Sequence, residues 1–287
     1  MQRALAAWLN QRGSEAVEAG NNDRGQLWYR MAATIRPDWS VPRYNLALRA
    51  KYRGDWRESL RLNQIASRLD PDDEAAWWNL GIAATALRDW SEARRAWIHL
   101  GISLVGSDCD GEVLASPVSA CVRLDPNGSG EVVWGTRIDP ARIEIYNIPL
   151  PESGHRFRDI VLNDGAQEGT RLREGREYPV FNELEIWKRS RYSTFEVDLV
   201  VPDEAAETRL IELCEQNDLG AEDWSSIRII CAACSRGNPG PHECTATEEN
   251  HCASYAFAAR DEKEIVAILG QWRSQVAGAE FDNVRTV

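Results

Sequence analysis

The stretch DPDDEAAWWNLGIAATALRDWSEARRAWIHL, residues 70–100, decides the fold of the first third of this chain. Apolar and small residues recur in it at spacings of three and four, which predicts two helices that each bury one face. Gly81 and Ala84 are small where the two helices must approach each other closely. Trp97 is large enough to fill the wedge between this pair of helices and a neighbouring pair. The stretch therefore predicts a helical hairpin.

The same pattern recurs toward the N-terminus with a period of 34 residues. The matching positions are Pro37 and Pro71; Asp55-Trp56 and Asp89-Trp90; Gly13, Ala47 and Gly81; and Ala16, Ala50 and Ala84. A fixed period of this length is typical of stacked helical repeats. We therefore expect three helical hairpins over residues 6–39, 40–73 and 74–107, with Asn63 in place of the large aromatic residue in the second.

This region resembles the tetratricopeptide repeat (TPR) family, whose hairpins stack into a solenoid that usually holds another polypeptide. The resemblance implies a concave groove lined by three residues of the first helix of each repeat. Carried over to this chain, they are Ala7, Asn10 and Ser14; Val41, Tyr44 and Leu48; and Ala75, Trp78 and Ile82. Family members that clamp a peptide carboxylate place Lys, Arg and Asn there, whereas this groove is mostly apolar. We expect Val41, Tyr44, Leu48, Trp78 and Ile82 to bind an apolar or extended segment, supplied by a partner or by the C-terminal half of the chain itself.

The net charge of −12 is unevenly distributed along the chain. Residues 1–107 carry 15 basic and 12 acidic side chains, whereas residues 108–287 carry 18 basic and 33 acidic ones. An acidic surface repels phosphate backbones, so we expect no nucleic-acid partner. It would attract a basic protein, although acidity also serves plain solubility.

No apolar run approaches the roughly 20 residues of a membrane span, and the N-terminal residues lack the apolar core of a signal peptide. We therefore expect a cytoplasmic protein. Lysine occurs only at positions 51, 188 and 263, a skew toward arginine that indicates a GC-rich bacterial genome.

Beyond residue 105 the helical period stops at the polar segment 106–111, and we expect an α+β protein. Residues 112–191 read as a small β domain, barrel-like or a curled sheet, with strands at 132–134, 142–148, 159–162 and 183–187. Residues 192–287 read as a split βαβ (ferredoxin-like) domain. Its expected elements are strands at 194–201, 227–230, 253–259 and 283–287 and helices at 203–216 and 261–274.

Four of the seven cysteines fall in one loop of that last domain, at Cys231, Cys234, Cys244 and Cys252. Four thiolates can close a tetrahedral shell around a structural zinc ion, which would hold a loop whose segment 235–241 has no apolar residues to bury. His242 or His251 could replace one cysteine. The alternatives are a disulfide, which a reducing cytoplasm disfavours, a redox pair, and unliganded thiols.

No phosphate loop, dinucleotide fingerprint or nucleophile elbow is present. His155, with Glu152 and Asp159 nearby in sequence, is the one histidine around which a general base could be assembled. A solvated turn histidine is the alternative explanation.

These observations favour a non-enzymatic protein-interaction scaffold of a bacterial cytoplasm that binds an apolar or basic polypeptide. A more specific version is an immunity protein that blocks a basic toxin. The hypothesis of a different class is an enzyme with its site near His155 or at an open metal position.

Overall fold

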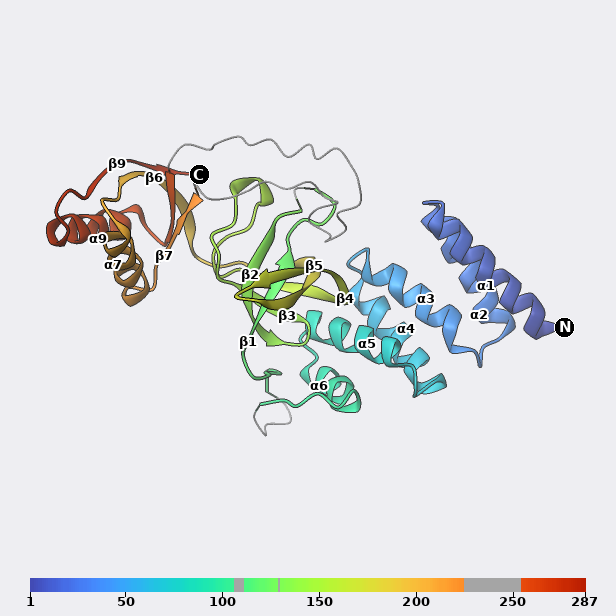
Figure 1. Ribbon diagram of the computed structural model, residues 1–287. Coiled ribbons are helices and arrows are strands. Elements are labelled where there is room, and N and C mark those ends of the chain that lie inside the picture. Colours follow the sequence, from blue (N-terminus) through green and yellow to red (C-terminus); the bar gives the residue numbers. More distant parts are fainter. Residues whose placement is uncertain (106–110, 129, 225–253) are drawn as a thin grey trace. The chain divides into compact units, whose positions relative to one another are not determined.

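A computed structural model describes residues 1–105, 111–128, 130–224 and 254–287 (Figure 1). The chain divides into two compact units, Met1–Pro117 with Ile138–Ala141, and Val118–Arg137 with Arg142–Val287. The first unit is dominated by helices, and the second contains the strands and two further helices. The protein is therefore a mixed helix-and-sheet protein with a helical N-terminal region.

The helices of the first unit follow one another in three pairs (Figure 1). Their bounds are α1 (Gln2–Glu18), α2 (Asn22–Ile35), α3 (Ser40–Lys51), α4 (Trp56–Leu69), α5 (Glu74–Ala86) and α6 (Trp90–His99). Within each pair the two helices pack along each other, and contacts of α2 with α3 and of α4 with α5 join consecutive pairs. None of the helices in the described ranges is long and apolar enough to span a bilayer.

The repeated Asp-Trp dipeptide marks the start of the second helix in two of the pairs. The side chain of Asp55 accepts a hydrogen bond from the Glu58 N–H at 3.2 Å, and Asp89 accepts one from the Glu92 N–H at 3.2 Å. Each carboxylate thus satisfies a backbone donor that a helix N-terminus leaves without an intrahelical partner. The 34-residue period is therefore a period of helix caps as well as of apolar residues.

The two helices of a pair approach each other at a glycine that faces an aromatic ring. A Cβ atom added to Gly81 would lie 2.4 Å from the ring of Trp97, and one added to Gly13 would lie 2.5 Å from the ring of Tyr29. Trp97 is fully buried and Tyr29 nearly so. The ring of Trp97 therefore packs inside its own pair of helices.

The second pair meets the same constraint with different residues. Ala47 stands where the other pairs have glycine, and Asn63 stands where they have an aromatic ring; both are fully buried. The additional methyl group of the alanine is thus matched by a smaller residue at the facing repeat position.

The second unit begins with a closed five-stranded barrel. Its strands are β1 (Val118–Arg123), β2 (Val132–Asp139), β3 (Arg142–Ile145), β4 (Ile160–Arg173) and β5 (Arg176–Lys188). Neighbours in sequence are neighbours in the barrel, and β1 pairs in parallel with β5, with Cys121 opposite Val180, to close it. Buried side chains such as Val122, Ile143 and Val161 form its core.

Strands β4 and β5 are much longer than the expected segments 159–162 and 183–187. Their outer halves, toward the turn at Glu174 and Gly175, are mostly exposed. Polar side chains lie on both faces of these outer halves. The outer halves therefore lack the apolar–polar alternation by which a half-buried strand is predicted from sequence. Strand β1 was missed as well.

The rest of the second unit is a four-stranded antiparallel sheet with two helices packed against it (Figure 1). In chain order the elements are β6 (Ser193–Val200), α7 (Glu204–Gln216), β7 (Gly220–Asp223), β8 (Ser254–Ala259), α9 (Glu262–Gln275) and β9 (Glu280–Thr286), and the sheet order is β7-β8-β6-β9. Leu210, Phe257 and Trp272 are central to the core. The indole N–H of Trp272 also donates to the Ala206 carbonyl at 2.8 Å, which joins α9 to α7.

Replacing Gly81 by Ala is expected to create an overpacking strain of about 1–3 kcal/mol, because the new methyl group would overlap the Trp97 ring. The higher helix propensity of alanine offsets roughly 1 kcal/mol of this strain, so the expected net loss of stability is up to about 2 kcal/mol. Thermal unfolding followed by circular dichroism measures the change. Gly270→Ala in α9 is the matched control and should raise the melting temperature, because among the described residues a Cβ atom added there meets nothing outside its own helix backbone within 4 Å. A Gly81→Ala protein as stable as the wild type would contradict the close contact.

Candidate functional site

The polar network around His155 lies on a tight turn that follows the barrel strand β3. Residues Pro151–Ser153 form a single 3₁₀ turn, and Gly154 ends it in the left-handed region with φ of 67°. The backbone N–H and the hydroxyl of Ser153 both donate to the Leu150 carbonyl, at 3.1 and 2.8 Å. This turn fixes where the next residue, His155, directs its ring.

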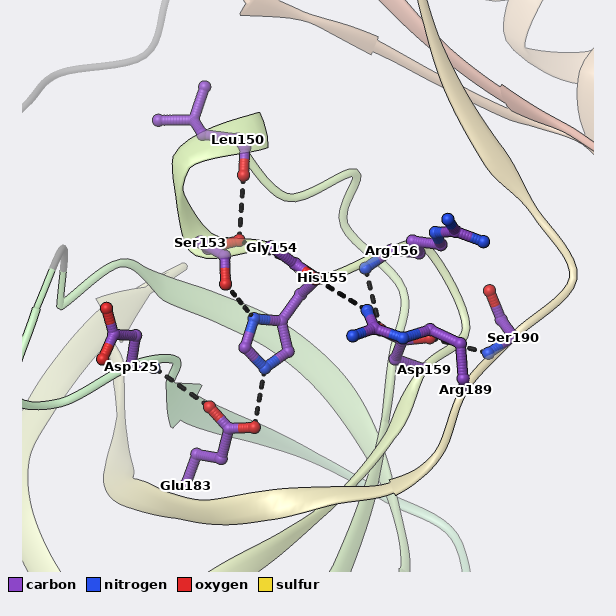
Figure 2. A network of polar contacts seen from close by, with 10 residues as sticks. All are labelled: Asp125, Leu150, Ser153, Gly154, His155, Arg156, Asp159, Glu183, Arg189 and Ser190. Atoms are coloured by element: carbon purple, nitrogen blue, oxygen red, sulfur yellow. Dashed lines mark hydrogen bonds and ion pairs between the residues drawn. The ribbon is translucent and has the colours of Figure 1, made fainter. Parts of the chain in front are cut away.

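His155 is buried and has an oxygen atom facing each ring nitrogen (Figure 2). Its Nδ1 lies 2.7 Å from the Ser153 carbonyl oxygen, and its Nε2 lies 2.6 Å from Oε1 of Glu183 on β5. The other carboxylate oxygen of Glu183 accepts a hydrogen bond from the Asp125 N–H at 3.0 Å. Because both partners of the ring are acceptors, the doubly protonated imidazolium fits this environment best.

The electrostatics agree with that protonation state. Burial lowers the pKa of His155, but the hydrogen bond to Glu183 and the negative charge of its carboxylate outweigh burial, so that the pKa is raised overall. His155 and Glu183 thus form an ion pair whose side chains are only 6 and 7% exposed. Removing one member of such a pair leaves an uncompensated charge in a poorly hydrated place.

Asp159 holds the other end of the same loop (Figure 2). Its carboxylate is fully buried and accepts hydrogen bonds from the Arg156 N–H at 2.9 Å, the Ser190 N–H at 2.7 Å and the Arg189 guanidinium at 2.8 Å. The same guanidinium nitrogen donates to the Gly154 carbonyl at 2.7 Å. The carboxylate therefore ties the loop to the segment that leads from β5 to β6.

Two further carboxyl groups hold the segment before the turn. Glu131 accepts a hydrogen bond from the Leu150 N–H at 3.1 Å, and Glu222 on β7 accepts from the Ile148 N–H at 2.8 Å and from the Asn147 amide at 2.7 Å. Burial raises the pKa of Glu131 to about 7, and the nearby charge of Glu222 adds to the effect. Burial also raises the pKa of Glu222. The contacts of Glu222 join the barrel to the four-stranded sheet.

This arrangement does not suit general base catalysis by His155. A general base needs a free lone pair within reach of a substrate proton, whereas both nitrogens of this ring are occupied and the ring is buried. The partner is Glu183 rather than the expected Glu152, which is exposed, and Asp159 bonds to the backbone and Arg189. The network stabilises the loop. No local sequence signal points to Glu183, because it lies 28 residues from His155 on another strand.

The expected groove residues lie on the first helices of the second and third pairs. Four of these side chains are half-buried, namely Val41, Tyr44 and Leu48 of α3 and Trp78 of α5. The side chain of Ile82 is fully buried. Helix α3 contacts α5, so the two rows of side chains belong to neighbouring helices.

Polar side chains connect the same row of first helices. The Asn45 amide donates to Asn10 of α1 at 3.0 Å, and the buried ammonium of Lys51 donates to Asn79 of α5 at 2.9 Å. Helices α1, α3 and α5 are therefore linked by side-chain hydrogen bonds. Asn10, one of the residues implied by the family resemblance, uses its side-chain oxygen in such a bond.

The cysteine loop with the expected zinc ligands Cys231, Cys234, Cys244 and Cys252 lies outside the described residues, as does the strand expected at residues 227–230. Cys121 and Cys214 are described, and both are free and buried. Burial raises the pKa of Cys121 to about 11 and that of Cys214 to about 12, so neither thiol is activated. Over the ranges that the structure describes, no group of three or more potential ligands could hold a metal ion.

Comparison with known proteins gives no assignment. No family model matches the chain, and no curated protein is found to be similar. Among solved structures, one match is the second TPR domain of Spaghetti (RPAP3) bound to the HSP90 peptide SRMEEVD, with 20% sequence identity and a TM-score of 0.33. It covers 34% of this chain and 88% of that one. A likeness of this extent carries no argument about function.

The stability of the protein is expected to fall as the pH rises from about 5 to 7, because the folded state keeps a proton on Glu131 that the unfolded chain loses near its ordinary pKa of 4.5. The difference between 4.5 and about 7 corresponds to about 3 kcal/mol. The raised pKa of His155 also makes the protein less stable as the pH rises, but only above the ordinary histidine pKa of 6.5. Urea unfolding at several pH values measures the slope.

Glu131→Gln should reduce the slope between pH 5 and 6.5, because glutamine imitates the protonated acid, and the raised pKa of Glu222 accounts for a slope that remains. Glu168→Gln, which neutralises an exposed glutamate, is the control and should leave the slope unchanged. An unchanged slope in Glu131→Gln would show that Glu131 is not the titrating group.

Proposed function

We propose that this protein is a non-enzymatic interaction protein whose N-terminal helix pairs form a TPR array that binds a polypeptide. The observation that carries the proposal is the row of half-buried apolar side chains, Val41, Tyr44, Leu48 and Trp78, on the adjacent first helices α3 and α5. Fully buried Ile82 would form part of the floor beneath the row. A bacterial cytoplasm, as the arginine-rich composition suggests, is part of the same proposal.

The indole of Trp78 adds a polar feature to this row. Its Nε1 atom is buried, and no acceptor for it lies within the described residues. An unmet buried donor costs roughly 1–3 kcal/mol, so this indole is a local cost to the stability of the helical unit.

The charge of the chain bears on the kind of partner. Residues 108–287 carry 33 acidic and 18 basic side chains, a surplus that would accelerate the association of a basic protein. We include a basic polypeptide in the proposal for this reason. The enzyme alternative gains no support from His155, whose two nitrogens are both occupied.

We further propose a structural zinc ion held by Cys231, Cys234, Cys244 and Cys252. Four thiolates suit a closed tetrahedral zinc shell. Exchanging Cys231 and Cys234 for Ser is expected to release about one equivalent of zinc, measured by elemental analysis of the purified protein, and to lower the melting temperature. Cys121→Ser, at a cysteine outside the loop, controls for the change of residue type. Equal zinc content in the wild-type and variant proteins would remove this proposal.

Exchanging Tyr44 and Trp78 for Ala is expected to abolish stoichiometric capture of a partner by the tagged protein, while the helical circular dichroism signal stays within a few per cent. The control exchanges the same two residue types elsewhere in the helical unit, Trp8→Ala and Tyr52→Ala, both of which are 53% exposed. Capture is measured by mass spectrometry of eluates at low and moderate salt. Equal loss in both double variants, or unfolding of the first one, would contradict a binding role for the row.

A further inference from the structure

A cleft of ≈ 460 Å³ lies within the second unit, where the barrel meets the helix α7 and strand β7. Its barrel side includes Glu144 on β3 and Tyr146 just beyond it, and its other side includes Glu215 on α7 and Glu222 on β7. This volume falls in the range of small-ligand sites. The cleft is separate from the His155 ring and from the groove of the helical unit.

The charges around the cleft are strongly unbalanced. Arg158 is its one basic lining residue, and it is already paired with the carboxylate of Asp218 at 2.7 Å. Within the described part of the chain, neither Glu144 nor Glu215 forms an ion pair. Glu222 accepts hydrogen bonds from neutral groups alone. The lining therefore presents carboxylates that no cation of the described residues neutralises.

The remaining lining is largely apolar. Ile148, Phe157 and Leu219 are buried at the cleft, and the ring of Tyr146 is 38% exposed. Apolar walls lower the local dielectric, which strengthens the attraction between a carboxylate and a cation more at half-buried Glu144 than at exposed Glu215. Aromatic rings add to that attraction when a cation lies over their faces. A ligand that fits has a positive end for the carboxylates and a short hydrocarbon chain for the walls.

We propose that this cleft binds a guanidinium or primary ammonium group carried on a short aliphatic chain, either as a free diamine-type molecule or as an arginine side chain of a bound polypeptide. The carboxylates of Glu144 and Glu215 would face the cation, and Ile148 and Tyr146 would contact the chain. The inference does not depend on the groove between α3 and α5, because the cleft lies entirely in the other unit.

Isothermal titration calorimetry of the full-length protein tests the proposal with two probes. Agmatine represents the free molecule, and the capped tripeptide acetyl-Gly-Arg-Gly-amide represents the side chain of a polypeptide. At low salt, at least one probe is expected to bind with a Kd at or below about 1 mM. Binding of agmatine alone would identify a small-molecule site, and binding of the tripeptide would identify a site for a basic polypeptide.

The double variant Glu144→Gln and Glu215→Gln should weaken binding at least about tenfold. The matched control is Glu168→Gln with Glu177→Gln, which removes the same charge from exposed positions on the long β4–β5 hairpin and should leave the Kd within about twofold. 4-Guanidinobutanoate, which has a carboxylate in place of the terminal aminomethyl group of agmatine, should bind more weakly than agmatine. No heat from either cationic probe, or equal weakening in both double variants, would overturn the proposal.

Discussion

In the first and third helix pairs, the close contact between the two helices depends on a position that has no room for a side chain. Gly13 and Gly81 let one helix approach a ring of the next, Tyr29 or Trp97, within the distance at which a Cβ atom would overlap it. The separation of two packed helices is set by the side chains at their contact. Since each pair then packs on the next through α2–α3 and α4–α5, this separation also decides which face of α3 and α5 is left for Tyr44 and Trp78.

In the second unit, buried charge has a structural role. Three ionisable groups there are of the kind found in active sites, namely His155, Glu183 and Asp159. Each of them already forms hydrogen bonds within the loop and its neighbouring strands. Fully satisfied polar networks of this sort make a structure rigid and specific. Glu131 and Glu222 extend the network to the junction between the barrel and the four-stranded sheet. Burial raises the pKa of both carboxyl groups at this junction.

The sequence predicted the helical region well because its information is local and repeated. The signals lie within one hairpin: the helix cap Asp89, and a glycine that faces a large ring, Gly81 and Trp97. Residue spacing alone therefore predicts them. The expected helices near residues 203–216 and 261–274 are also present, at nearly those bounds. Helices with one buried face carry a strong periodic signal.

The strands and the polar network were predicted less well for physical reasons. Strand β7, Gly220–Asp223, has almost no apolar residues, and the outer halves of β4 and β5 are polar on both faces. The partner of His155 was assigned to its sequence neighbours, whereas the barrel brings Glu183 to it from another strand. Long-range pairings of single residues leave no pattern in one sequence.

The parallel pairing of β1 with β5 has a consequence for the order in which the protein acquires its structure. The barrel closes only when Cys121–Arg123 pair with Val180–Asn182, so a large loop has to be ordered before this pairing forms. The helices need partners only from an adjacent pair. Local contacts form faster than distant ones, and domains begin to fold while the chain is still being synthesised. The helical unit can therefore fold on a nascent chain before β5 has been synthesised, so that its surface is available to other molecules before the barrel closes.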